Sequence, residues 1–134
     1  MKVRHLHPWD VTPREAVKIQ GALRGKLRLG ERVFSGHLRY IGGADISYTR
    51  GDDRFFAAVI ILEWPSLRMI EEATHAEKVT FPYVPGLLSF REGPPLLRAF
   101  EKLKRLPDVV LFDGQGIAHP RGFGLASHMG LILN

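Results

Sequence analysis

The chain has 134 residues, enough for one domain with a substantial core, and 45% of them are hydrophobic. Cysteine is absent, which excludes disulfide bonds, thiolate metal sites and a cysteine nucleophile. No apolar run approaches the roughly 18 residues of a membrane span, and the N-terminal MKVRHLHPWD lacks the apolar stretch of a signal peptide, so we expect a cytoplasmic chain without membrane contact.

The net charge of +5 is unevenly distributed along the chain. Residues 1–40 contain nine Lys or Arg against three acids, whereas the remainder contains ten against eleven. Such a basic flank fits contact with nucleic-acid phosphates, whose binding affinity comes mainly from Lys and Arg. A solvated basic arm that includes a helix is the simpler interpretation, and charge alone favours it.

The first predicted element is a helix. Residues 12–15 (TPRE) have the pattern of a helix start, with a threonine N-cap, proline at the first helical position and a glutamate that completes a capping box. The residues that then share one apolar face are Ala16, Ile19 and Leu23. The helix should end near Gly25, and a basic connector should follow as far as Gly36.

Three strands are predicted next. Residues 40–48 (YIGGADISY) alternate, and residues 54–63 (RFFAAVIILE) are apolar throughout, as expected of a central strand covered on both faces. Residues 67–76 alternate loosely as a third strand. Because only the short turns TRGDD and WPS separate these strands, we expect an antiparallel meander.

The second half alternates loops with regular elements. Residues 80–86 (TFPYVPG) contain two prolines and should form a loop, after which residues 89–106 have apolar side chains at helical spacing. The helical stripe comprises Leu96, Phe100 and Leu103. Residues 109–112 (VVLF) predict a short buried strand, and residues 122–131 a last helix. The element order predicts one α/β domain over residues 1–134, without internal repeats.

Three acids have positions that fit a cation site. Asp45 lies within the first predicted strand among apolar neighbours, where a carboxylate should be partly desolvated, although an edge position is the commoner explanation. Glu92 also fits a second capping box with Ser89, and Asp113 follows a strand, where it fits either a turn or a ligand site at the strand's carboxyl end. Each acid alone therefore has an ordinary structural interpretation.

Taken together, the same acids would suit a divalent cation such as Mg²⁺, which prefers oxygen ligands. Two carboxylates about 4 Å apart repel each other by roughly 4 kcal/mol at an effective dielectric constant of 20, so a cluster of three demands a compensating cation. Their spacing in the sequence does not establish that they converge.

Three ordered motifs resemble the endonuclease V family: GADISY at 43–48, FPYVPGLLSFREGP at 81–94 and DGQGIAHPRGFGLASHMG at 113–130. The N-terminal LHPWDVTPREAVKIQ adds to the resemblance. It implies an RNase H-like mixed sheet, with a three-strand antiparallel meander, a further strand and flanking helices. It also implies a metal-dependent endonuclease of DNA repair, which recognises deoxyinosine and cleaves the second phosphodiester bond on its 3′ side. Some family members act on inosine in RNA.

The resemblance also assigns roles to residues. It implies catalytic and metal-binding roles, with Mg²⁺ or alternatively Mn²⁺, for Asp45, Glu92 and Asp113. It implies a wedge that enters the duplex at the lesion, made of Pro82, Tyr83, Val84 and Pro85. It implies a pocket for the flipped base, shaped by Gly86, Leu88, Gly114, Gly116 and His119. Candidate phosphate contacts are Arg91 and Arg121, with His119 as an alternative, whereas His128 is expected to be a structural histidine that packs on the last helix.

Members of the family continue past the position of Asn134 with another strand and helices, so we expect the sheet of this chain to be incomplete at its C-terminus. An exposed edge there would favour self-association. The alternative to an active nuclease is a truncated, cleavage-deficient protein that binds inosine or nucleic acid. Other enzyme classes fit poorly, because the sequence has no G-x-S-x-G, G-x-x-x-x-G-K-[ST] or H-E-x-x-H motif.

Overall fold

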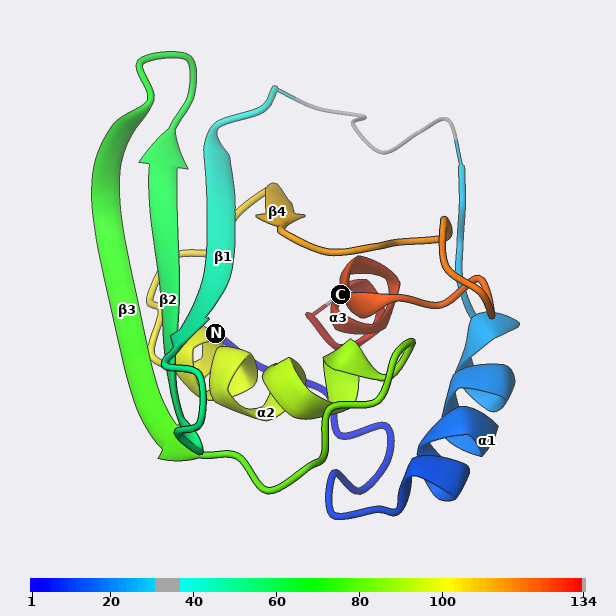
Figure 1. Ribbon diagram of the computed structural model, residues 1–134. Helices are drawn as coiled ribbons and strands as arrows, with labels where there is room; N and C mark the ends of the chain where they lie inside the picture. Colours follow the sequence, from blue (N-terminus) through cyan, green and yellow to red (C-terminus); the bar gives the residue numbers. More distant parts are fainter. Residues whose placement is uncertain (31–36, 134) are drawn as a thin grey trace.

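The computed structural model describes residues 1–30 and 37–133. One mixed sheet with strand order β3-β2-β1-β4 has helices packed on one side (Figure 1). The strands are β1 (Tyr40–Tyr48), β2 (Arg54–Glu63), β3 (Arg68–Lys78) and β4 (Val109–Phe112), and the helices are α1 (Pro13–Arg24), α2 (Leu88–Glu101) and α3 (Leu125–Leu133). The predicted meander of β1, β2 and β3 is confirmed, and β4 pairs parallel to β1.

Helix α1 begins and ends as its sequence predicts. The Thr12 hydroxyl accepts a hydrogen bond from the Glu15 amide at 3.3 Å, and the Glu15 carboxylate accepts one from the Thr12 amide at 2.8 Å, which completes the capping box. Gly25 is the C-cap. Part of the predicted basic connector, including Gly36, lies outside the described residues.

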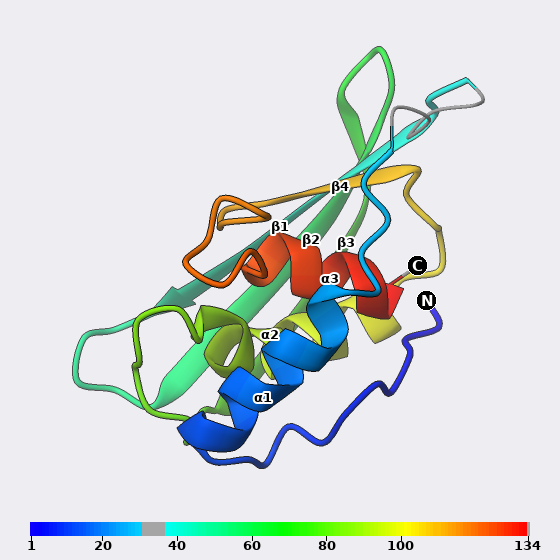
Figure 2. The same ribbon diagram turned by 90° about the vertical axis from the view of Figure 1, so that its right-hand side faces the viewer.

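Strand β2 is central, but its predicted coverage on both faces is wrong for the described residues. Phe55 and Val59 are buried, whereas Phe56, on the opposite face, is 48% exposed. Figures 1 and 2 show why: α2 and α3 lie on the same side of the sheet. An uninterrupted apolar run therefore does not by itself distinguish a strand covered on one face from one covered on both.

Three element boundaries differ from the prediction, each for a local reason. Strand β3 extends to Lys78 because its pairing with β2 continues to Arg54. Helix α2 ends at Glu101, and the Glu71 carboxylate accepts hydrogen bonds from the next free amides, those of Lys104 and Arg105, at 2.7 and 3.0 Å. Gly122 has a φ of +64°, outside the helical region, so α3 begins only at Leu125.

The apolar side chains form two clusters. The larger joins the sheet to α2 and α3, and it contains the predicted stripe of Leu96, Phe100 and Leu103. The smaller cluster comprises Ala16, Phe81, Leu87 and Phe90, and it joins α1 to the loop before α2 and to the start of α2. Helix α1 is therefore seated on that loop, away from the sheet, as Figure 1 shows.

The first residues of the chain lie against its last helix. The Arg4 amide donates a hydrogen bond to the Ile132 carbonyl at 2.9 Å, and the Met1 ammonium donates to the Glu101 carbonyl at 3.2 Å. In Figure 2 the first residues of the chain lie near the end of α3, in agreement with the bond between Arg4 and Ile132. The N-terminal segment thus closes the helical side of the domain.

A chain of hydrogen bonds, buried at its His128 end, connects this segment to two helices. The Ser89 hydroxyl lies 2.9 Å from His128 Nδ1, the two Nε2 atoms of His128 and His7 are 2.7 Å apart, and His7 Nδ1 lies 2.7 Å from the Pro8 carbonyl. That carbonyl can only accept, so neutral His7 carries its proton on Nδ1. His128 must then donate through Nε2 and accept from Ser89. Burial lowers the pKa of His128 to about 3, and burial also lowers the pKa of His7.

Gly124 lies where no side chain fits. A Cβ atom there would collide with the Gln115 carbonyl group, and the Gly124 amide already donates to the Gly116 carbonyl at 2.8 Å. We expect Gly124→Ala to reduce the free energy of unfolding by about 3 kcal/mol, at the upper end of typical overpacking costs. Urea denaturation measures this loss.

The matched control is Gly21→Ala. Gly21 lies within α1, and nothing lies within 4 Å of a Cβ added there. This substitution should raise the free energy of unfolding by about 0.5–1 kcal/mol, the usual helical difference between the two residues. A Gly124→Ala protein as stable as the Gly21→Ala protein would contradict the close backbone approach.

Candidate active site

Two of the three candidate acids are brought together by strand pairing. In the parallel pair of β1 and β4, the last register partners are Ala44 and Phe112. The residue that follows each of these partners is an acid: Asp45 in β1 and Asp113 immediately after β4. Adjacent parallel strands in register therefore place these carboxylates at the same level of the sheet.

The third acid, Glu92, extends from α2, and its charge is coupled to the other two. Burial raises the pKa of Glu92, the negative charges of Asp45 and Asp113 raise it further, and the Arg91 guanidinium opposes them, with a net pKa of about 7. Only carboxylates close in space interact in this way. The charges of the strand acid and the strand-end acid thus reach the helix acid, which places all three in one neighbourhood.

Two of the individual expectations for these acids are wrong. Asp45 is exposed, not desolvated, and one of its carboxylate oxygens accepts a hydrogen bond from the Ile46 amide at 2.8 Å. Glu92 does not cap α2, because the N-cap position is Leu87 and no side chain caps this end. The Ser89 hydroxyl bonds His128 instead.

The chemistry of the three acidic side chains suits a hard divalent cation. All three groups are carboxylates, and the repulsion that raises the pKa of Glu92 is what a bound divalent cation would relieve. In the ranges 1–30 and 37–133, however, no three acids or histidines are arranged closely enough to form a metal-binding group. The three side chains would have to draw together around the ion.

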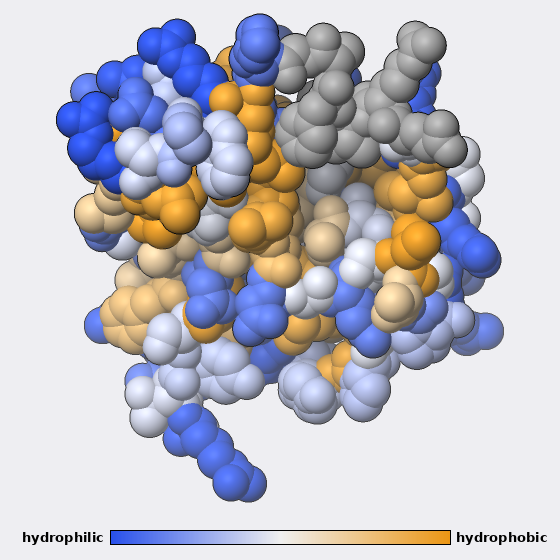
Figure 3. Space-filling view, turned by 90° about the horizontal axis from the view of Figure 1, so that it is seen from above, coloured by the Kyte–Doolittle hydropathy of each residue, from blue (hydrophilic) through white to orange (hydrophobic). Residues whose placement is uncertain are grey.

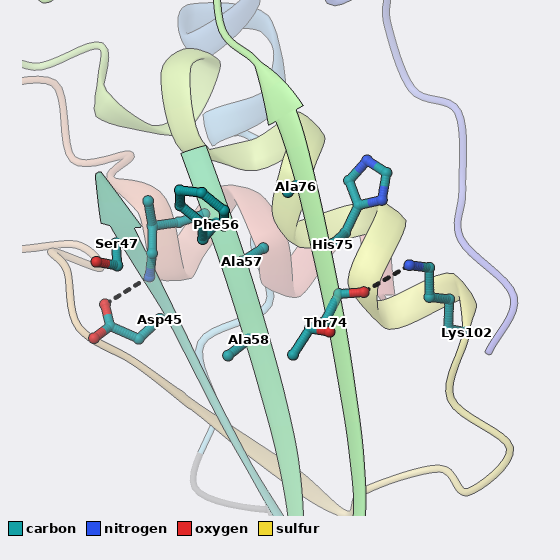
Figure 4. Close-up of a pocket in the computed structure, with 10 residues that line it drawn as sticks. Asp45, Ser47, Phe56, Ala57, Ala58, Thr74, His75, Ala76 and Lys102 are labelled. Carbon is teal, nitrogen blue, oxygen red and sulfur yellow. Dashed lines mark hydrogen bonds between the residues drawn. The ribbon is translucent and has the colours of Figure 1, made fainter. Parts of the chain in front are cut away.

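A cavity of about 670 Å³ borders Asp45. Figure 4 shows Asp45 at one end and Lys102 at the other, with Phe56 and Thr74 between them. The register aligns Asp45 with Ala58 and Thr74 across the uncovered face of the sheet, and Lys102 Nζ donates to the Thr74 carbonyl at 2.6 Å. The carboxylate therefore faces a wide surface that is open to a large ligand.

The predicted wedge loop projects its aromatic ring into solvent. Tyr83 is 68% exposed, while Phe81 and Leu87, on either side of the loop, are buried in the cluster that joins it to α1. Val84 packs against the same cluster. An exposed ring on a loop with buried flanks is suited to displace a stacked base.

The two arginines for which phosphate contact is predicted bind this loop. Arg91 Nη1 donates to the Phe81 carbonyl at 2.7 Å, and its guanidinium lies 4.9 Å from the centre of the Phe55 ring. Arg121 Nη2 donates to the Gly86 carbonyl at 2.8 Å, and its Nε donates to Gln20 Oε1 at 2.6 Å. A role in holding the loop, which the sequence did not indicate, thus accounts for these contacts.

The residues predicted to shape a base pocket come from two neighbouring segments. Gly86, with a φ of +80°, and the half-buried Leu88 lie at the start of α2, and His119 reaches across to bond the Gly86 carbonyl at 3.0 Å. A Cβ on Gly114 would be 3.0 Å from the Leu125 side chain, whereas one on Gly116 would meet only Ser127, at 3.7 Å. The segments around Gly86 and His119 are therefore in contact.

Figure 3 shows the molecule from the end that carries the β2–β3 turn, where hydrophobic and hydrophilic residues are interspersed on the surface. Apolar side chains there lie between polar ones, and the exposed apolar residues of this turn are Trp64 and Leu67. On the edge strand β4, Leu111 is 65% exposed. Within the described part of the chain, no helix is long and apolar enough to cross a membrane.

Comparison with known proteins identifies the family. The family model described as Endonuclease V matches residues 22–134. Endonuclease V of Methanothrix thermoacetophila is 48% identical over 134 residues, which is 100% of this chain and 57% of that protein. Endonuclease V of Dehalococcoides mccartyi is 44% identical over the same length, 59% of that protein. The chain thus spans less than two thirds of these relatives.

Solved structures agree with the sequence comparisons. Endonuclease V from Streptomyces avermitilis superposes with a TM-score of 0.86 at 41% identity, covering 98% of this chain and 57% of that one. A Ciona intestinalis endonuclease V, crystallised with DNA containing an inosine followed by a ribo-adenosine, superposes with a TM-score of 0.80 at 31% identity, over 88% of this chain and 52% of that one. The RNase H-like fold is thereby confirmed, and the chain belongs to the endonuclease V family.

Proposed function

We propose that this chain forms the catalytic part of a metal-dependent endonuclease that recognises deoxyinosine in DNA and cleaves the second phosphodiester bond on its 3′ side. The observation that carries the proposal is the pairing of β1 with β4, which places Asp45 and Asp113 at the same level of the sheet, where both charges act on Glu92. Adjacent strands and the helix beside them supply these acids, and the DNA complex of the Ciona intestinalis relative supports the substrate.

The three carboxylates would hold the cation. When bound, Mg²⁺ supplies positive charge for the phosphate and lowers the pKa of a coordinated water. Glu92 keeps its proton near pH 7 without a cation, and it must lose that proton to become a ligand. Cation affinity should therefore rise as the pH increases through 7. Asp45 and Asp113 are both exposed, so a cation can reach their carboxylates from solvent.

The loops supply recognition. The exposed Tyr83 ring would occupy the space that a base leaves when it is extruded, and a weakly paired inosine is easier to extrude than a normal base. The two segments that meet at Gly86 and His119 would receive the flipped base, largely through main-chain groups. The lesion is thus selected by how readily its base leaves the helix, followed by its fit to the pocket.

The test is cleavage of an end-labelled duplex with a single deoxyinosine, in the presence of Mg²⁺ or of EDTA. We expect one product, cut at the second phosphodiester bond 3′ to the lesion, only with Mg²⁺, and none from the same duplex with deoxyadenosine in that position. A folded chain that binds the inosine duplex and leaves it intact would contradict the proposed reaction.

Two narrower expectations accompany the proposal. Inosine in RNA contains the same base, so an RNA strand with one inosine belongs in the same assay to establish which backbone is preferred.

The exposed Leu111 on the edge strand β4 supports self-association, because unpaired strand edges recruit further strands. Light scattering over a concentration series measures the mass of the assembly.

A further inference from the structure

The loop that carries Tyr83 is held at both ends by side chains that bind its carbonyl groups. Before the loop, the Phe81 carbonyl accepts from Arg91. After it, the Gly86 carbonyl accepts from three donors: Gln20 Nε2 at 2.9 Å, His119 Nε2 at 3.0 Å and Arg121 Nη2 at 2.8 Å. A carbonyl oxygen has two lone pairs, so three donors saturate it. This end of the loop is the more firmly held.

Gln20 is at the centre of this arrangement. Its side chain is 1% exposed, it comes from α1, and each of its polar atoms is bonded. Besides the Gly86 carbonyl, Nε2 reaches the Phe123 carbonyl at 3.2 Å, and Oε1 accepts from Arg121 Nε at 2.6 Å. One buried amide therefore connects α1, the Tyr83 loop and the segment after β4.

Gln20 also orients one of the other two donors to the Gly86 carbonyl, because it accepts a hydrogen bond from Arg121. The guanidinium is planar, so fixing its Nε on Gln20 also aims its Nη2 at the Gly86 carbonyl. The approach is close, because a Cβ on Gly86 would be 2.6 Å from that Nη2 atom. Loss of Gln20 would remove its own bond to Gly86 and leave the Arg121 donor unaligned.

We propose that Gln20 is the positioning residue of the Tyr83 loop and thereby sets the ability of the protein to open a duplex at the lesion. The inference rests on the proposed function. A rigid loop enters the base stack without first losing conformational freedom, whereas a loose loop must be ordered at the moment of binding. In a single strand no paired base has to be displaced, so the rigidity of the loop matters less there.

The test compares one lesion in two contexts, a duplex and a single strand that each contain one deoxyinosine. Gln20→Met keeps the length of the side chain and removes all three of its hydrogen bonds. We expect duplex cleavage to fall about tenfold, as the loss of one to two net hydrogen bonds implies, and single-strand cleavage to stay within about twofold of the parent. Tyr83→Ala should show the same selective loss.

The control is Val17→Met in the same helix, where Val17 is 40% exposed. It should leave both rates unchanged. Gln20→Glu keeps the acceptor for Arg121 but turns a carboxylate oxygen toward the Gly86 and Phe123 carbonyls, so its duplex-selective loss should be at least as large as that of Gln20→Met. If Gln20→Met lowers both rates equally, Gln20 acts through general stability and the inference is overturned.

A second readout needs no catalysis. Backbone NMR order parameters of Tyr83 and Val84 should fall from about 0.85, the rigid value, toward roughly 0.6 in Gln20→Met, and stay high in Val17→Met. If the parent protein cleaves neither substrate, the proposed function fails, and these order parameters alone decide the positioning role. An equally rigid loop in Gln20→Met would overturn it.

Discussion

Asp113→Asn should abolish cleavage while leaving the fold as stable as before or more stable. We expect the single-turnover rate on the inosine duplex to fall by more than about a hundredfold, beyond the roughly 10–100-fold typical of groups that only support a ligand. Stability should not fall, because the charge of Asp113 raises the pKa of Glu92 and therefore opposes the ionised form of that side chain. Cleavage assays and urea denaturation at about pH 8, on one preparation, test the predicted loss of activity and the predicted retention of stability.

Asp108 provides a control with the opposite outcome. It lies just before β4, and its carboxylate accepts hydrogen bonds from the Tyr40 and Arg39 amides at 2.7 and 2.8 Å, which hold the pKa of Asp108 below its usual value. Asp108→Ala should unfold at a lower urea concentration and cleave at the parental rate. If Asp113→Asn instead destabilises the protein as Asp108→Ala does, Asp113 is a structural acid and its catalytic assignment is wrong.

The second large effect is acid sensitivity caused by His128. Its pKa is about 3 in the folded protein, against 6.5 for an unperturbed histidine, so this contribution to stability is fully present above pH 6.5 and is lost as the pH falls toward 3. The complete loss amounts to about 5 kcal/mol, comparable with the whole stability of a small domain. His7, whose pKa burial also lowers, acts in the same direction. Urea denaturation at about pH 7.5 and about pH 4.5 measures the effect.

Glu92 contributes with the opposite sign, since its raised pKa favours the folded state in acid and this contribution is lost as the pH rises from 4.5 to about 7. His128→Gln isolates the histidine, because glutamine stays neutral and can still bond Ser89. This variant should be less stable than the parent near neutral pH and should lose less stability on acidification. His5→Gln, an exposed position in the same N-terminal segment, should retain the parental acid dependence. Equal acid dependence in the parent and in His128→Gln would contradict the assignment.

The elements of the fold were predictable because each depends on local patterns. The capping box at Thr12, the short turns between the strands and the stripe that includes Leu96 are read within a few residues, and all are confirmed. The boundaries that moved depend on distant partners. Helix α2 ends early where the Glu71 carboxylate binds the Lys104 and Arg105 amides, and nothing near residue 101 signals that contact.

The sequence predicted the acids of the candidate site, but it did not predict the residues that hold the neighbouring loop in place. The motifs implied Asp45, Glu92 and Asp113, and the parallel pairing of β1 with β4 explains how two of them meet. Gln20 was missed although a signal existed: it lies four residues after Ala16 and three before Leu23, a polar residue on the apolar face of a helix. Such a residue needs a buried partner, but its partners, Gly86 and Arg121, lie 66 and 101 residues away and could not be read from the sequence.

The hydrogen bond between His7 and His128 joins residues 121 positions apart in the chain. During synthesis the N-terminal segment leaves the ribosome first and finds its docking site only after α3 has been made, whereas the β1–β2 and β2–β3 hairpins can form much earlier. Trp9 stacks on His128 in the folded domain, and this contact can form only once α3 is present. Docking of the N-terminal segment therefore requires α3 to be in place, and in a variant without Trp64 we expect the fluorescence of Trp9 to report this docking during refolding.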